Sequence, residues 1–192
     1  MAELKDLLFA AIEKGEKAEV AKLLKEGANP NAKDAQGRTA LMLASAKGDS
    51  EIIKTLIKGG AKVDAKDGQG RTALTKAVSL GKVKAAQTLV AAKADLDAKD
   101  AGGWTPLMYA AELGKWKAAK FLIKKGANIN AKDNAGWTPL VHAFADMHLT
   151  GAEFLISKGA KADGKAILEF NPLRLAAKHS DKKLGKLADK LE

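Results

Sequence analysis

The chain of 192 residues contains no cysteine, which excludes disulfide frameworks, thiol nucleophiles and thiolate metal sites. Aromatic residues make up only 5% of it, and histidine occurs three times, at His142, His148 and His179. No stretch approaches the roughly 18 uncharged apolar residues of a membrane span. The absence of cysteine fits a cytoplasmic protein and equally an exported protein whose signal has been removed.

Arginine is as rare as histidine, because Arg38, Arg71 and Arg174 are the only three, and lysine carries almost all of the positive charge. The formal net charge is +10, so nucleic acid and acidic membrane surfaces have to be weighed as partners. By contrast, hydrophobic residues make up 46% of the chain, which is enough for an ordinary folded core.

A period of 33 residues runs through the chain. It is kept by the aspartates Asp34, Asp67, Asp100 and Asp133, by the threonines Thr39, Thr72, Thr105 and Thr138, by the leucines Leu41, Leu74, Leu107, Leu140 and Leu173, and by the lysines Lys33, Lys66, Lys99, Lys132 and Lys165. So many residue types at one spacing indicate a repeat architecture, in which each unit is stabilised by stacking on its neighbours.

Each unit is predicted to contain two helices. In DAGGWTPLMYAAELG (residues 100–114), we expect Thr105 to cap the first helix and Pro106 to occupy its first position. Gly114 is expected to end that helix in the left-handed conformation. The segment KWKAAKFLIKKG (residues 115–126) has the apolar spacing of a second helix.

These segments, with GRTALMLASAKGDSEIIKTLIKGGAKVDAKD in the first half, resemble the ankyrin repeat, whose pattern is a Gly turn, TPLH-x-A, a central Gly and a closing GA-x-x-N. The resemblance implies an all-α solenoid of helix–turn–helix units with projecting β-turn fingers. It divides a single domain, residues 1–192, into an N-terminal cap (1–33), four repeats (34–66, 67–99, 100–132 and 133–165) and a C-terminal cap (166–192). It also implies that turn tips and first helices form a concave binding surface.

Several residues depart from the repeat pattern. Lys93 and Met147 stand where the pattern has glycine, and a left-handed non-glycine residue costs roughly 1 kcal/mol, so these loops are predicted to be strained or reshaped. The fourth repeat carries Phe144 and Gly151 at unusual positions, which predicts either an altered loop path or repacking with Phe144 filling the space left by Gly151. Trp116 is expected to pack in the core.

The candidate site is derived from helix geometry. At about 100° per residue, the residue two after the leucine of each first helix points away from the core. The scarce aromatic residues gather on this predicted concave side and on the turns beside it, and surface tryptophan and tyrosine are typical of interfaces. The alternative is that each turn tryptophan packs flat on the next repeat. The predicted protein-binding residues are Trp104, Tyr109, Leu113, Trp137, His142, Phe170, Leu80, Arg71, Lys76 and Arg38.

The predicted surface is basic toward the N-terminus and aromatic toward the C-terminus. A monomer that binds a protein partner with an acidic segment and an apolar anchor matches both halves. Two alternatives stay open: an anion-binding surface for nucleic acid or acidic membrane through lysine and arginine, and an engineered or structural repeat scaffold without a natural ligand. The lysines of residues 115–125 weigh against the first, because they lie on a second helix, away from the predicted groove.

The sequence contains no arrangement that points to catalysis, a cofactor or a metal. GQGR (residues 68–71) has the look of a phosphate loop, but it follows no strand, lacks the later glycine and is explained by the repeat turn. His142 and His148 are six residues apart, which does not place two ligands on one helical face. We therefore predict a non-enzymatic binding module without a cofactor.

Overall fold

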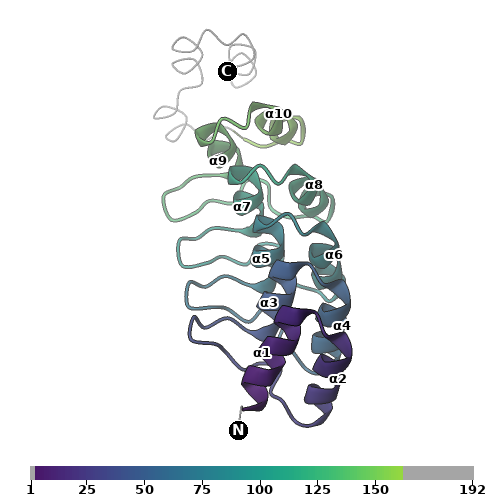
Figure 1. The fold of residues 1–192 in the computed structure, drawn as a ribbon. Coiled ribbons are helices and arrows are strands. Elements are labelled where there is room, and N and C mark those ends of the chain that lie inside the picture. Colours follow the sequence, from purple (N-terminus) through teal and green to yellow (C-terminus); the bar gives the residue numbers. More distant parts are fainter. Residues whose placement is uncertain (1–2, 162–192) are drawn as a thin grey trace.

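The computed structural model describes residues 3–161, which form an elongated stack of helix pairs (Figure 1). The helices of this part are α1 (Leu4–Lys14), α2 (Lys17–Lys25), α3 (Ala40–Lys47), α4 (Ser50–Lys58), α5 (Ala73–Ser79), α6 (Val83–Ala91), α7 (Pro106–Glu112), α8 (Trp116–Lys124), α9 (Pro139–Ala145) and α10 (Leu149–Ser157). The expected C-terminal cap at 166–192, with Phe170, lies outside the described residues.

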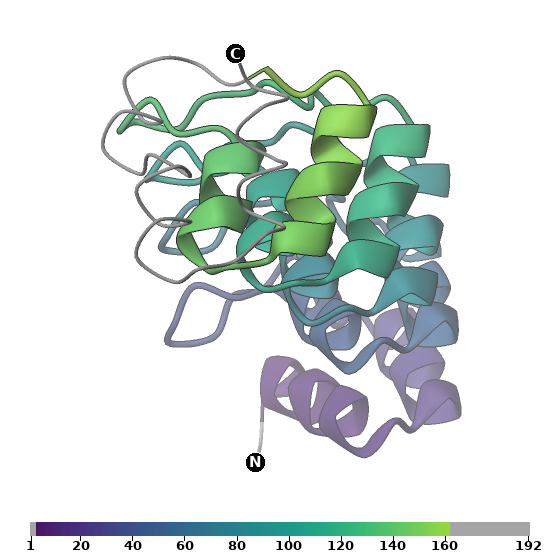
Figure 2. The same ribbon diagram turned by 90° about the horizontal axis from the view of Figure 1, so that it is seen from above.

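Odd-numbered helices form an inner row and even-numbered helices an outer row, and long loops project from the side opposite the outer row (Figures 1 and 2). We call these loops fingers; they span residues 33–38, 66–71, 99–104 and 132–137. Within residues 3–161 there is no strand, only an isolated bridge between Lys33 and Thr39, so the predicted all-α solenoid is confirmed. None of the helices in this range is both long and apolar enough to span a bilayer.

The inner helices begin where the sequence predicts. Thr39, Thr72, Thr105 and Thr138 each accept a hydrogen bond at the side-chain oxygen from the backbone N–H three residues later, at 3.3–3.4 Å. In the first three repeats the bond is reciprocated, because Met42, Thr75 and Met108 accept from the N–H of the cap residue. The fourth repeat has a valine at that position, so its cap is the weaker one.

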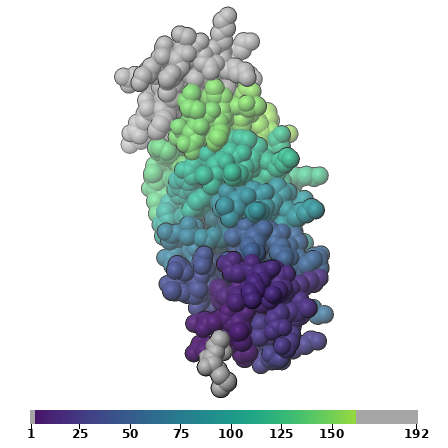
Figure 3. Space-filling view, viewed as in Figure 1, coloured from purple at the N-terminus to yellow at the C-terminus, as the bar shows by residue number. Residues whose placement is uncertain are grey.

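The core is continuous along the stack. The leucines of the 33-residue period, Leu41, Leu74, Leu107 and Leu140, are at most 1% exposed, and the inner helices pack against one another from α1 to α9. The space-filling view shows successive repeats in contact along the long axis (Figure 3). Because these helices are short, their stability depends on this stacking rather than on their own hydrogen bonds.

Hydrogen bonds between repeats explain the periodic lysines. The ammonium groups of Lys33, Lys66 and Lys99 each donate to the carbonyl oxygen 33 residues later, at 2.7–2.8 Å. These bonds join the base of one finger to the base of the next. Lys33, Lys66 and Lys99 are therefore structural donors as well as surface charges.

Lys93 and Met147 do adopt the left-handed conformation, with φ of 64° and 57°. Around Met147 the backbone follows the path of the preceding repeat, because His148 and Lys115 both donate from the N–H to the carbonyl oxygen five residues earlier, at 2.8 Å. The expectation of an altered loop path is therefore wrong. The loop keeps the backbone path of the preceding repeat, with Met147 in a left-handed conformation that is strained for a non-glycine residue.

Gly151 makes room for a tryptophan rather than for Phe144. A methyl group at Gly151 would overlap the six-membered ring of Trp116, which packs from the preceding repeat against the apolar core as expected. Phe144 is 2% exposed and fills the fourth repeat's own core. The expectation that Phe144 fills the space left by Gly151 is therefore wrong, because Trp116 occupies that space.

Replacing Lys93 or Met147 by glycine is expected to stabilise the protein by about 1 kcal/mol each, because glycine adopts positive φ without strain and both side chains are exposed. Denaturant unfolding measures the change. Lys125→Gly is the matched control, since its φ is −89° and glycine there brings no relief. A loss of stability in Met147→Gly would contradict the assigned strain.

Gly151→Ala is expected to destabilise the protein by about 1–3 kcal/mol through overpacking against Trp116. Helix propensity alone predicts the opposite sign, a gain of nearly 1 kcal/mol in the interior of α10. In a Trp116→Leu background the alanine should become neutral or stabilising. Denaturant unfolding of the parent, the two single variants and the double variant measures the sign of the change in stability. Stabilisation by Gly151→Ala in the parent protein would rule out the packing of Trp116 on Gly151.

Candidate functional site on the finger face

The finger face is the surface formed by the fingers and the exposed sides of the inner helices. Each finger is shaped by the aspartate that opens its repeat. One carboxylate oxygen, Oδ1, accepts hydrogen bonds at 2.8–2.9 Å from the backbone N–H groups two and four residues later in all four fingers, at Asp34, Asp67, Asp100 and Asp133. The carboxylate thus closes the finger turn upon itself.

The other carboxylate oxygen, Oδ2, ties the finger to its inner helix. It accepts from the side chain nine residues later: Lys76 Nζ at 2.9 Å from Asp67, and Tyr109 Oη at 2.6 Å from Asp100. His142 Nε2 lies 3.0 Å from the Oδ2 of Asp133. In the first repeat the equivalent residue is a leucine, and Arg38 Nε donates to Asp34 Oδ2 instead, at 2.6 Å. We call the bond from Oδ2 to the side chain nine residues later the finger clasp.

Pairing with aspartates, through the clasp and through the arginines of the fingers, neutralises much of the positive charge in the basic half of the finger face. Both Arg71 and Lys76 lie on Asp67, whose side chain is 1% exposed. Burial alone would raise the pKa of Asp67, but the hydrogen bonds from Lys76, from two backbone N–H groups and from Arg71 lower it to about 2. Arg38 is paired with Asp34 as well, although 42% of its side chain stays exposed. The cations predicted to meet a partner are therefore engaged within their own repeats.

The aromatic half is a packed row. The Trp104 ring centroid lies 5.1 Å from that of Tyr109 and 4.0 Å from that of His142, which in turn lies 5.3 Å from Trp137. His142 is 2% exposed, so the expectation that it faces solvent is wrong. Burial between the two indole rings lowers the pKa of His142, against the opposing effect of Asp133, and favours the neutral ring.

The predicted site residues therefore differ in accessibility. Leu80 and Leu113, at the same position of adjacent repeats, are 53% and 43% exposed. Trp104, Tyr109 and Trp137 are half-buried. Trp104 packs on His142 of the next repeat at a tilted angle, as the packing alternative expects in part, and its ring keeps a surface open to solvent. A role of the tryptophans in contacting a partner stays a prediction.

The sequence interpretation missed a hollow of about 250 Å³ at this face. It lies between the third and fourth fingers and is lined by Trp104, Trp137, His142, Glu112, Asp146, Asp133, Ala135 and Ala145. It also missed the finger clasps, although the invariant aspartate and the polar residue nine positions later are both visible in the sequence. A side chain that points away from its own core can still be covered by its own finger.

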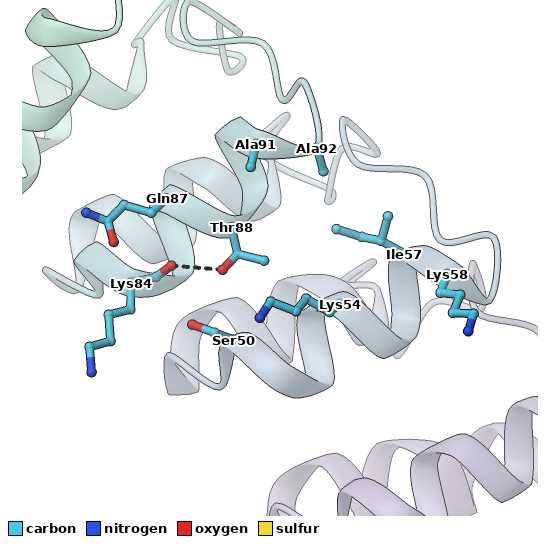
Figure 4. Close-up of a pocket in the computed structure, with 9 residues that line it drawn as sticks. All are labelled: Ser50, Lys54, Ile57, Lys58, Lys84, Gln87, Thr88, Ala91 and Ala92. Carbon is cyan, nitrogen blue, oxygen red and sulfur yellow. Dashed lines mark hydrogen bonds between the residues drawn. The ribbon is translucent and has the colours of Figure 1, made fainter.

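A larger hollow, of about 690 Å³, lies between the outer helices α4 and α6, on the side opposite the fingers (Figure 4). Its floor is Ile57, Ala91 and Ala92, and Lys54, Lys58 and Lys84 stand at its margins. It contains no aromatic or acidic side chain, and its sides are the smooth flanks of two helices. This surface offers less chemical specificity than the finger face.

Lys76→Met is expected to cost about 1.5 kcal/mol at pH 7, because it removes a hydrogen bond to a buried carboxylate. The pKa of Asp67 is lower in the folded protein than its ordinary value of 3.8, so this stabilisation is present above about pH 4 and is lost as the pH falls toward 2. The cost measured by denaturant unfolding should therefore shrink over that range. Lys54→Met, at an exposed pair with Glu51, is the control and should lower the free energy of unfolding little at any pH. A destabilisation by Lys76→Met that does not change with pH would contradict the clasp.

Comparison with known proteins agrees with the repeat geometry. The sequence model of the family described as "Ankyrin repeats (3 copies)" matches residues 7–100 and 93–166. None of the curated proteins matches the chain. Ankyrin repeats generally mediate protein–protein interaction and are typically not enzymes. With its 33-residue period, paired helices and fingers, the chain belongs to the ankyrin-repeat family.

Proposed function

We propose that the protein is a non-enzymatic binding module that holds a protein partner on its finger face, which we take as the concave face of the solenoid. The contact is centred on the third and fourth repeats, at Trp104, Tyr109, Leu113 and Trp137, with Leu80 beside them. His142 is itself buried and supports this surface, because its ring packs against the rings of both Trp104 and Trp137.

The observation that carries the proposal is the exposed apolar pair Leu80 and Leu113. Both side chains leave roughly half of their surface to water, and they occupy equivalent positions of adjacent repeats, at the ends of the inner helices α5 and α7. Large apolar side chains exposed at matching positions of neighbouring repeats are a feature that favours an interaction surface. Tryptophan and tyrosine held in fixed orientations also lose little conformational entropy when a partner covers them.

The basic half contributes in a more limited way. Arg38 keeps the largest exposed cationic surface of the three predicted contacts there, whereas Lys76 is 15% exposed. An acidic partner segment near the first two fingers remains a prediction, resting mainly on Arg38. Lys76 acts chiefly through the finger clasp, and Arg71 through its own ion pair with Asp67.

The alternatives have less support. An anion-binding surface needs uncommitted cations, yet the groove cations pair with aspartates and Lys33, Lys66 and Lys99 donate to backbone carbonyls. A scaffold without a ligand gives no reason for two adjacent exposed leucines at the finger face.

The double variant Leu80→Glu/Leu113→Glu tests the proposal, because it places two charges in the apolar patch without touching the core. Peptides selected from a displayed random library against the parent protein should bind this variant at least tenfold more weakly, about 1.4 kcal/mol or more. The matched control is Gln87→Glu/Ala91→Glu, two exposed positions of α6 with the same charge change, which should leave binding intact.

Three results would contradict the proposal. Peptides that bind the leucine variant as well as the parent protein would remove the finger face as the site. Peptides lost with the α6 control would move the site to the outer helices, and a library that yields no binder would favour the scaffold alternative.

A further inference from the structure

The hollow between the third and fourth fingers has walls and a mouth of different chemistry. Its walls are the rings of Trp104 and Trp137 with His142 between them. The part of its lining that we call its mouth consists of Glu112, the last residue of α7, and Asp146, which directly follows α9. About 250 Å³ exceeds an engineered cavity of about 150 Å³ that accommodates benzene, so a planar side-chain group with part of its stem fits.

The two carboxylates at the mouth lack the partners that other acids of this face have. Asp34 and Asp67 pair with arginine or lysine, and Asp100 and Asp133 bond to Tyr109 and His142. Within residues 3–161, no cation pairs with either Glu112 or Asp146. Partial burial of Glu112, with the nearby charge of Asp146, raises the pKa of Glu112.

This combination selects one class of side chain. A purely apolar group would cover the carboxylates without pairing them, which costs free energy, and an acidic group would be repelled. A guanidinium group is planar, stacks on indole rings and donates paired hydrogen bonds to a carboxylate. An arginine can therefore satisfy the walls and the mouth at once.

We propose that the hollow between Trp104 and Trp137 receives the guanidinium group of an arginine from the protein partner, with Glu112 and Asp146 as its counter-ions. The inference rests on the proposed function, since the arginine belongs to a partner on the finger face. The partner segment that faces the third and fourth repeats is then expected to carry a positive charge, opposite to the acidic segment predicted for the basic half. The sequence alone indicated an apolar anchor at these two repeats.

The test uses Nα-acetyl-arginine amide as the probe and the indole N–H signals of the full chain in NMR spectra as the readout, each assigned by a single Trp→Phe substitution. The arginine probe should shift the signals of Trp104 and Trp137 in a saturable manner and leave Trp116, on the far side of the inner helices, unchanged. Nα-acetyl-citrulline amide has nearly the same shape without the charge. At matched ionic strength it should bind at least threefold more weakly.

Glu112→Gln/Asp146→Asn should weaken the arginine probe at least threefold, whereas the control Glu16→Gln/Glu153→Gln removes the same charge at two exposed positions and should not. Equal shifts with citrulline, no shifts with arginine, or shifts unaffected by the Glu112/Asp146 variant would each overturn the proposal. If the arginine probe fails while the Leu80/Leu113 variant still loses its peptides, the finger face remains the binding site and only the guanidinium assignment falls. If the probe binds while those peptides are unaffected, the hollow takes a cation but is not the partner site.

Discussion

The carboxylate that opens each repeat is the constraint on which the finger face depends. One oxygen closes the finger turn through two backbone N–H groups, and in three of the four repeats the other oxygen holds the inner helix nine residues later. Without this clasp, the finger would be joined to the helix only through the backbone and through side-chain packing. With it, finger and helix present one surface whose side chains have fixed positions.

The residue nine positions after the aspartate then decides the character of each repeat. Lys76 makes its repeat polar and compensates Asp67, whereas Tyr109 and His142 build an aromatic row with the tryptophans of the fingers. Because the clasp engages the hydroxyl group of Tyr109, what remains of this side chain for a partner is the face of its ring. The negative charge left uncompensated lies farther along, at Glu112 and Asp146. The same backbone thus offers different chemistry from one repeat to the next.

The sequence was sufficient for the architecture because the 33-residue period is carried by residues with strict local roles. The threonine caps, the paired helices, the core position of Trp116 and the left-handed Lys93 and Met147 follow from local rules and are seen in the structure. Accessibility did not follow, because helix geometry tells which side chains leave their own core but not which are covered by a finger or by the next repeat. His142 and the Trp116–Gly151 contact are both of this kind.

The central claim is that a partner covers the fingers and inner helices of the third and fourth repeats. Hydrogen exchange of the full chain with and without a selected peptide tests this most directly. The account predicts slower exchange in residues 101–113 and 134–146 on binding, with α4, α6 and α8 unchanged. Protection confined to the outer helices, with the two fingers exchanging as in the free protein, would contradict it.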